Sequence, residues 1–206
     1  TLTVENAGTA VDQYSITGDW ANKNYAVTFK NEQGAEQPAV FTVTPRPVTV
    51  TIGNAWGFYG DAPDLSQVTL TPDSLPSGDS VRDILTTGDL TTTATAQTPA
   101  GQTAAITAKS TLSGSKADNY TVSFAGSGGT AGTYTVEKRP ITITLLDHSS
   151  VSGEAVDDGI ANPAEDTDYR VSVTPGNTVT TSGALVNGDG LQVTLSTTAA
   201  QGEDAG

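Results

Sequence analysis

The chain repeats part of its own sequence, and this repeat constrains the fold more than any other feature. Residues 24–29 read NYAVTF and residues 119–124 read NYTVSF. A polar, glycine-containing loop follows each block, and then come FTVTPRPVTVTI from Phe41 and YTVEKRPITITL from Tyr134. The offset is 95 residues for the first pair of blocks and 93 residues for the second. Self-similarity at a nearly fixed period is typical of an array of structural modules.

Each repeated block alternates with the period of a β-strand. Tyr25, Val27 and Phe29 fall on one face of the first block, and the blocks PVTVTI and ITITL alternate in the same way. The composition agrees, because 35 Thr, 18 Val and 7 Ile are β-branched while 22 Gly and 10 Pro supply turns. The sequence therefore predicts strands, with each NYxVxF block forming a hairpin with the [FY]TV block that follows it.

Arg-Pro dipeptides at 46–47 and 139–140 predict two module boundaries, because proline favours an extended exit and lacks a backbone donor. The boundaries give a partial module at 1–45, a complete module at 46–138 and a divergent or partial module at 139–206. The first segment has no equivalent of PVTVTI, and the last has no NYxVxF block. A short helix is expected near Ser80–Leu85, capped by Asp79 or Ser80. The predicted fold class is mainly β, built of tandem small modules that are β-grasp-like or β-sandwich-like, each with at most one short helix.

Charge and missing residue types exclude several classes of function. The 23 Asp and Glu residues against 9 Lys and Arg give a net charge of −14, which excludes an electrostatic nucleic-acid binder. No run approaches the roughly 18 apolar residues of a membrane-spanning helix, so no membrane insertion is expected. The chain has no Cys, which excludes disulfides and thiolate metal sites, and His148 is its only histidine.

Three motifs resemble catalytic ones but lack the partners that catalysis needs. Ser113 and Lys116 match an S-x-x-K pattern, yet the S-D-N and K-T-G motifs that accompany it are absent. Residues 126–132 resemble the start of a dinucleotide fingerprint but lie between two predicted strands. His148 neighbours Asp147 and Ser149, whose side chains point to the opposite face of a strand. No enzymatic activity is therefore predicted, and no cofactor other than a candidate Ca²⁺ ion.

An aromatic and acidic loop, NAWGFYGDAP at residues 54–63, is the candidate ligand-binding site. Trp56 and Tyr59 lie beside Asp61 in this loop. Aromatic rings stack on the apolar faces of sugars, and a carboxylate accepts hydrogen bonds from sugar hydroxyls. The alternative is that Phe58 and Tyr59 anchor the loop on the hydrophobic core. Trp20 leaves the same two alternatives open.

The C-terminal segment carries the candidate cation site. Asp158, Glu165, Asp166 and Asp168 could supply the several hard oxygen ligands that Ca²⁺ takes from a flexible loop. The spacing does not match an EF-hand loop. The alternative is that these carboxylates only keep the surface soluble.

The order of the blocks resembles the MBG-type repeats of large bacterial surface proteins, which carry a Tyr-Gly-Asp motif and are related to the β-grasp repeats of mucin-binding proteins. The resemblance rests on RPVTVTI, Phe58–Pro63, Leu75–Asp79, Asn119–Phe124 and YTV at 134–136. The C-terminal segment departs from it, because it has no Tyr-Gly-Asp motif. The resemblance implies an extracellular protein, secreted or at a bacterial cell surface, with a stalk or adhesion role.

The sequence leaves three functions open. The first is a non-catalytic stalk or spacer of an adhesin, whose partners are neighbouring repeats of the parent chain. The second is an adhesin repeat that binds a host glycan or a host surface protein. The third is an accessory domain of a secreted glycan-processing enzyme.

Overall fold

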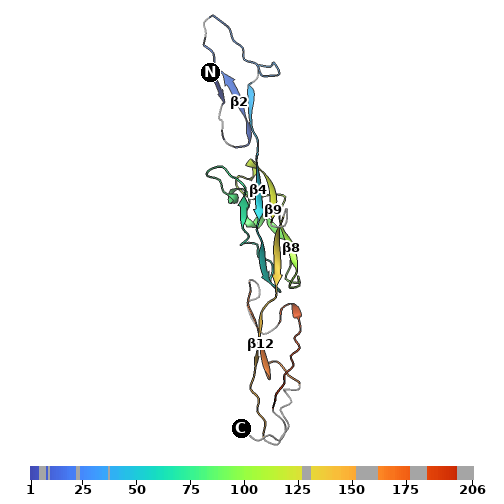
Figure 1. Cartoon of the computed structure of the whole chain (residues 1–206). Helices are drawn as coiled ribbons and strands as arrows, with labels where there is room; N and C mark the ends of the chain where they lie inside the picture. The colour runs from blue at the N-terminus through green and yellow to red at the C-terminus, as the bar shows by residue number, and fades with distance from the viewer. Residues whose placement is uncertain are drawn as a thin grey trace.

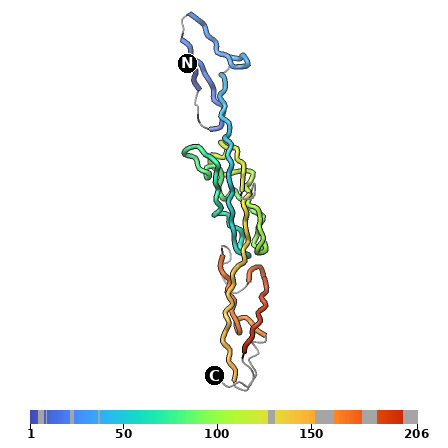
Figure 2. The backbone as a smooth tube through the Cα atoms, in the orientation of Figure 1, coloured from blue at the N-terminus to red at the C-terminus, as the bar shows by residue number. Residues whose placement is uncertain are grey.

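The molecule is elongated, and its segments follow one another from the N-terminus at one end to the C-terminus at the other (Figures 1 and 2). The computed structural model describes residues 1–4, 8, 10–21, 24–36, 38–126, 131–151, 162–176 and 185–198. We call residues 1–45, 46–138 and 139–206 the N-terminal, middle and C-terminal segments. Every strand pairing among the described residues lies within one of these segments.

The middle segment consists of two small sheets. Its strands are β4 (Arg46–Ile52), β5 (Ala55–Phe58), β6 (Leu70–Pro72), β7 (Leu90–Thr92), β8 (Thr103–Ala108), β9 (Tyr120–Gly126) and β10 (Gly132–Glu137). One sheet has the order β6-β4-β9 and the other has the order β5-β10-β8-β7. β4 pairs with β9, and β5 pairs with β10, in parallel. The expected hairpin of β9 with β10 does not form, because these consecutive strands belong to different sheets.

Alternation along the strands builds the core of the middle segment, as the sequence pattern predicts. Val48, Val50 and Ile52 of β4 are buried, and Val48 and Val50 pack with Ile84 and Leu85 in one cluster. A second cluster joins Ile52 to residues of β7, β8 and β10 and to the loops beside them: Val68, Leu90, Ala94, Ile106, Tyr134 and Val136. The two clusters are continuous through β4. The fold is mainly β, as expected.

The predicted helix forms as a single 3₁₀ turn over Val81–Asp83, shorter than the helix expected near Ser80–Leu85. Ser80 begins it, and the Asp83 carboxylate accepts a hydrogen bond from the Ser80 backbone N–H at 2.7 Å, as in a capping box. Ile84 and Leu85 follow directly and are fully buried. The described residues contain no α-helix; the other helical turns are Thr87–Asp89, Ala117–Asn119 and Val186–Gly188. None of them is long enough to cross a membrane.

The N-terminal segment reproduces part of the middle segment. Its strands β1 (Leu2–Val4), β2 (Asp12–Gly18) and β3 (Ala39–Val43) form an antiparallel sheet in the order β1-β2-β3. In this sheet Ile16 lies opposite both Val4 and Ala39, just as Ile106 of the middle segment lies opposite Thr92 and Gly132. The three strands are therefore the counterparts of β7, β8 and β10.

The strand expected over residues 24–29 does not form. Tyr25 is 71% exposed, and Val27 and Phe29 are each 45% exposed. The matching residues of the middle segment form β9, which pairs along its whole length with β4. Within the described residues, the N-terminal segment has no counterpart of β4, so this block lacks the strand that would order it.

The C-terminal segment reproduces a different part of the middle segment, the pairing of β4 with β6. β11 (Ile141–Leu145) pairs antiparallel with β12 (Tyr169–Val173). Leu145 lies opposite Tyr169, as Ile52 lies opposite Leu70. β11 and β12 are thus the counterparts of β4 and β6. In the described part of this segment, no strand pairs with the second edge of β11.

Candidate functional site

The Tyr59-Gly60-Asp61 motif forms a tight turn at the end of β5. The Asp61 N–H donates to the Phe58 carbonyl at 3.0 Å, and the Gly60 N–H donates to the Ala96 carbonyl at 3.2 Å. Gly60 has a φ of +90°, a conformation that side chains other than glycine disfavour. The turn therefore presents the Asp61 carboxylate toward the end of the middle segment that meets the C-terminal segment.

Asp61 is paired there with Arg139. The Arg139 Nη2 atom lies 2.7 Å from Asp61 Oδ2, and the two side chains are 3% and 4% exposed. Arg139 Nε donates to the Tyr59 carbonyl at 2.7 Å, and Nη1 donates to the Thr174 carbonyl at 2.5 Å. The guanidinium carbon also lies 5.5 Å from the centre of the Phe58 ring. One buried cation thus ties the turn after β5 to the chain after β12.

The C-terminal segment packs closely over the same turn. A Cβ atom on Gly60 would lie 2.6 Å from Cγ2 of Val186, and one on Gly176 would lie 1.8 Å from Oδ2 of Asp61. Asn187 Nδ2 donates to the Ala96 carbonyl at 2.9 Å. Two glycines are therefore needed for the approach of the two segments. We call this set of contacts around Asp61 and Arg139 the junction clamp.

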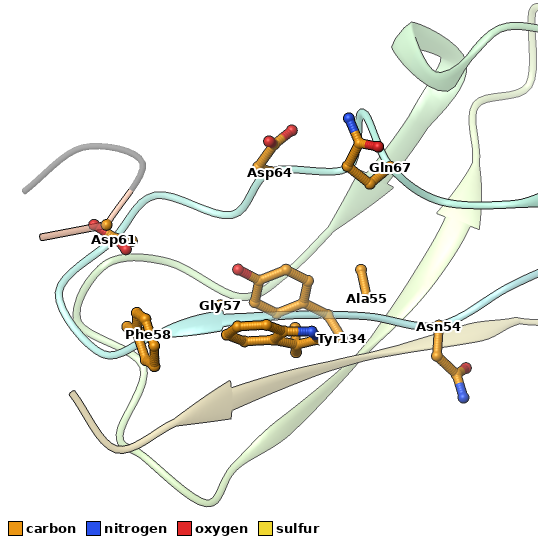
Figure 3. Close-up of a pocket in the computed structure, with 10 residues that line it drawn as sticks. Asn54, Ala55, Gly57, Phe58, Asp61, Asp64, Gln67 and Tyr134 are labelled. Carbon is orange, nitrogen blue, oxygen red and sulfur yellow. The ribbon is translucent and has the colours of Figure 1, made fainter. Parts of the chain in front are cut away.

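A pocket of about 420 Å³ lies beside the clamp. It runs along β5, with Asp61 and Asn54 at opposite ends and Asp64 and Gln67 over one side (Figure 3). Trp56 lines it and is 58% exposed, with its ring in an edge-to-face contact with Phe58 at 5.3 Å. An exposed indole beside carboxylate and amide groups is the type of surface that binds sugars.

The structure brings Trp56 and Asp61 to this pocket and separates Tyr59 from it. Tyr59 does not line this pocket; it packs against the core and lines a second cavity beside Arg139. Asp61 lines the pocket, but its carboxylate is engaged in the junction clamp. Sequence reasoning missed Arg139, although the repeated Arg-Pro dipeptide marked its position.

Tyr134 is a second pocket residue that the sequence did not reveal as one. Its side chain is buried, and a Cβ atom on Gly57 would lie 2.1 Å from its hydroxyl oxygen. Burial raises the pKa of Tyr134, and the nearby carboxylates of Asp61 and Asp64 raise it further. The phenol therefore stays protonated in the pocket at neutral pH.

The candidate Ca²⁺ ligands are dispersed where they are described. Asp158 lies outside the described residues. The Asp168 carboxylate turns inward, accepts a hydrogen bond from the Ala164 N–H at 2.6 Å and lies 3.3 Å from His148 Nε2. Asp166 is exposed, near Arg170. Among the described residues, no three acidic or histidine side chains are placed to hold one metal ion. The Ca²⁺ site stays a prediction.

Ser113 and Lys116, the S-x-x-K residues, bind different carboxylates. Ser113 Oγ donates to Asp89 at 2.8 Å, and Lys116 Nζ donates to Asp79 at 2.5 Å. Each contact fixes a loop end: Asp89 ends one 3₁₀ turn, and Lys116 precedes another. The dinucleotide-like loop falls mostly on residues 127–130, outside the described chain.

The Tyr120 hydroxyl also donates to Asp79, and this bond gives a measurable titration. This hydrogen bond is the main reason, and burial the second, that the pKa of Tyr120 is raised to about 12. The hydrogen bonds from Lys116 and Tyr120 lower the pKa of Asp79. Tyr120 thus stabilises the fold below its ordinary pKa of 10, and that contribution is lost as the pH rises toward 12. Asp79 stabilises it above its ordinary pKa of 3.8, and that contribution is lost on acidification.

We expect tyrosinate absorbance to include a step near pH 12 that belongs to Tyr120, and Asp79→Asn to move the midpoint of this step down toward 10. The substitution removes the negative charge that opposes ionisation of the phenol and leaves a neutral acceptor in its place. A Tyr120→Phe variant identifies the residue by the loss of this step. An unchanged high midpoint in Asp79→Asn would show that Asp79 is not its cause.

Comparison with the models of known families, with curated proteins and with solved structures finds no match to this chain.

Proposed function

We propose that this chain is a non-catalytic extracellular spacer, part of the stalk of a bacterial surface adhesin. The observation that carries the proposal is the junction clamp, in which Arg139 and Asp61 are almost fully buried at the meeting point of two segments. A buried pair with several hydrogen bonds fixes one geometry, because moving either segment would leave a charge without its partner. Adjacent segments held in this way transmit their orientation along the array.

The path of the chain supports a spacer. β4 continues into β5 in the same direction, β9 and β10 run parallel to them, and the chain leaves the middle segment through Arg139 at the end opposite to its entry (Figure 2). Entry and exit at opposite ends add length with each repeat. The resemblance to MBG-type repeats supports the location outside the cell.

Small-angle X-ray scattering on the 206-residue chain tests the proposal. We expect the scattering of a rod with a constant cross-section across the middle and C-terminal segments. A compact particle, or the scattering of beads that move freely on a flexible string, would contradict a spacer.

A second candidate function, glycan binding, is favoured by the exposure of Trp56 over the β5 pocket. The ring presents an apolar stacking surface, while Asp64, Gln67 and Asn54 offer polar groups to sugar hydroxyls. A glycan array on the chain tests this role. Binding that is lost in Trp56→Ala and kept in Trp20→Ala would establish it, because Trp20 is exposed in a different segment. Binding that is insensitive to Trp56 would exclude this pocket as the site.

A further inference from the structure

The β5 pocket combines an exposed aromatic ring with polar groups on the side opposite β5. Trp56 lies on β5, while Asp64 and Gln67 lie over the other side of the pocket (Figure 3). Tyr134, on the neighbouring strand β10, is buried and lines the pocket between them. A ligand in this pocket would therefore contact an aromatic surface and several polar groups at the same time.

Contacts within the protein hold these groups in place. A backbone N–H of β10 donates to Asn54 Oδ1 at 2.9 Å, and the Tyr134 hydroxyl is hydrogen-bonded to the Asp64 backbone. The edge-to-face contact with Phe58 supports the Trp56 ring. Groups that are ordered beforehand lose less conformational entropy on binding, and a volume of about 420 Å³ is in the range of small-molecule sites. The pocket is therefore suited to a small ligand.

The charge of the pocket is negative and lies on Asp64. Among the described residues that line the pocket, the ionisable side chains are Asp61, Asp64 and Tyr134, and none is basic. Asp61 is neutralised by Arg139, and the Tyr134 phenol is uncharged because burial raises its pKa. Asp64 is exposed, and hydrogen bonds from Ser66 lower its pKa and keep it ionised. The pocket therefore favours a cationic ligand over a neutral or an anionic one.

The Trp56 ring favours a cation as well. The face of an indole carries partial negative charge and attracts an ammonium group, and the same face stacks on the apolar side of a sugar ring. The ring is 58% exposed, so its surface is accessible to a ligand in the pocket. One residue can thus contact both the ring of a sugar and an amine attached to that ring.

We propose that the β5 pocket binds a sugar that carries a protonated amine, a hexosamine without an N-acetyl group. The ammonium group pairs with the Asp64 carboxylate, and the sugar ring stacks on Trp56. The amides of Asn54 and Gln67 and the Tyr134 hydroxyl serve the hydroxyl groups of the sugar, which a simple alkyl amine would not use. This ligand class rests on the glycan-binding role, the second candidate function above, and is independent of the spacer role.

Acetylation of the amine is expected to weaken binding, because it removes the positive charge. The acetylated sugar loses both its pairing with Asp64 and the attraction between its ammonium group and the Trp56 ring. An ion pair with an exposed carboxylate and a cation–π contact at an exposed ring are each modest. Together they are expected to make the amine form bind about tenfold more tightly than a neutral form.

Three disaccharides with the same glucose skeleton and linkage separate charge from shape. At the second carbon of each ring they carry an amine, an acetamide or a hydroxyl, and the last of them is cellobiose. Each is titrated into the isotope-labelled chain at mildly acidic pH, where the amines are protonated and Asp64 stays ionised. The NMR signals of the Trp56 indole and of the β5 amides then report both the affinity and the site. We expect the amine disaccharide to bind about tenfold more tightly than the other two.

Asp64→Asn tests the contribution of the charge. The substitution keeps the shape of the side chain, and the amine disaccharide is then expected to bind no more tightly than the neutral ones. The matched control is Asp19→Asn, which removes the same charge at an exposed position beside the exposed Trp20 in the N-terminal segment. We expect this control to keep the preference for the amine, and Trp56→Ala to lose binding of all three disaccharides.

The outcomes distinguish the ligand class from the glycan-binding role. Equal affinities for the three disaccharides, all lost in Trp56→Ala, would overturn the amine and leave the glycan-binding role standing. No change at β5 with any of them would overturn the proposal, and the glycan array then decides the glycan-binding role separately. An equal loss in Asp64→Asn and Asp19→Asn would show a general attraction to an acidic chain. Acetyl-lysine amide with a free side-chain amine, if it bound as tightly as the amine disaccharide, would overturn the sugar in favour of a protein side chain.

Discussion

Asp61→Ala is expected to lower the free energy of unfolding of the middle segment by about 3–5 kcal/mol, the usual cost of removing one partner of a buried ion pair. The reason is that Arg139 would remain buried with its charge unmatched, held only by two backbone carbonyls and the Phe58 ring. Urea denaturation followed by tryptophan fluorescence measures the loss, since Trp56 lies on β5 beside the clamp.

Two further variants test whether the unmatched charge of Arg139 causes the loss of stability in Asp61→Ala. Asp64→Ala removes an exposed carboxylate from the same pocket and is expected to cost about 0.5 kcal/mol. Asp61→Ala combined with Arg139→Leu removes both charges and is expected to recover part of the stability lost in the single variant. Equal losses in Asp61→Ala and Asp64→Ala would mean that the clamp adds nothing to stability.

Ile106→Ala is expected to destabilise the middle segment by about 2–5 kcal/mol, because it leaves a cavity in a fully packed core. Ile106 has no exposed surface and packs between the residues of the second hydrophobic cluster. Its counterpart in the N-terminal segment, Ile16, occupies the same register position but is only partly buried. The same substitution there is expected to cost clearly less.

Comparison of the two variants at low protein concentration measures how much less the N-terminal sheet depends on Ile16 than the middle segment does on Ile106. Thermal unfolding gives the loss of stability of each variant. Amide hydrogen exchange at β2 and β8 reports the loss in the N-terminal sheet and in the middle segment separately within one chain. Equal destabilisation at Ile16 and Ile106 would contradict this expectation, because it would show that Ile16 lies in a core as complete as that around Ile106.

The strands that the sequence predicted correctly are those whose partners lie within their own segment. Alternation along PVTVTI and ITITL predicted β4 and β11, and both form. The NYAVTF block alternates equally well and does not form a strand, whereas NYTVSF forms β9. Local pattern is the same in the two blocks, so the difference comes from β4, a non-local partner that no local pattern can report.

The candidate site also depends on non-local contacts that a local sequence pattern does not report. The Tyr-Gly-Asp motif was visible in the sequence, and Gly60 does adopt the left-handed conformation that a tight turn requires. The role of Asp61 was not visible, because its partner Arg139 is 78 residues away and the contacts of Gly176 and Val186 come from a third region of the chain. Burial of a carboxylate is a property of the assembled junction rather than of its motif.

The central claim is that the junction clamp holds the middle and C-terminal segments in one orientation. The chain has no cysteine, so Thr107→Cys on β8 and Ser172→Cys on β12 place two spin labels at exposed positions on either side of the junction. The distance distribution between the labels, measured by pulsed electron paramagnetic resonance, is expected to be narrow with a single maximum, and to broaden when Asp61→Ala is added. A broad distribution in the chain with Asp61 intact would contradict the claim.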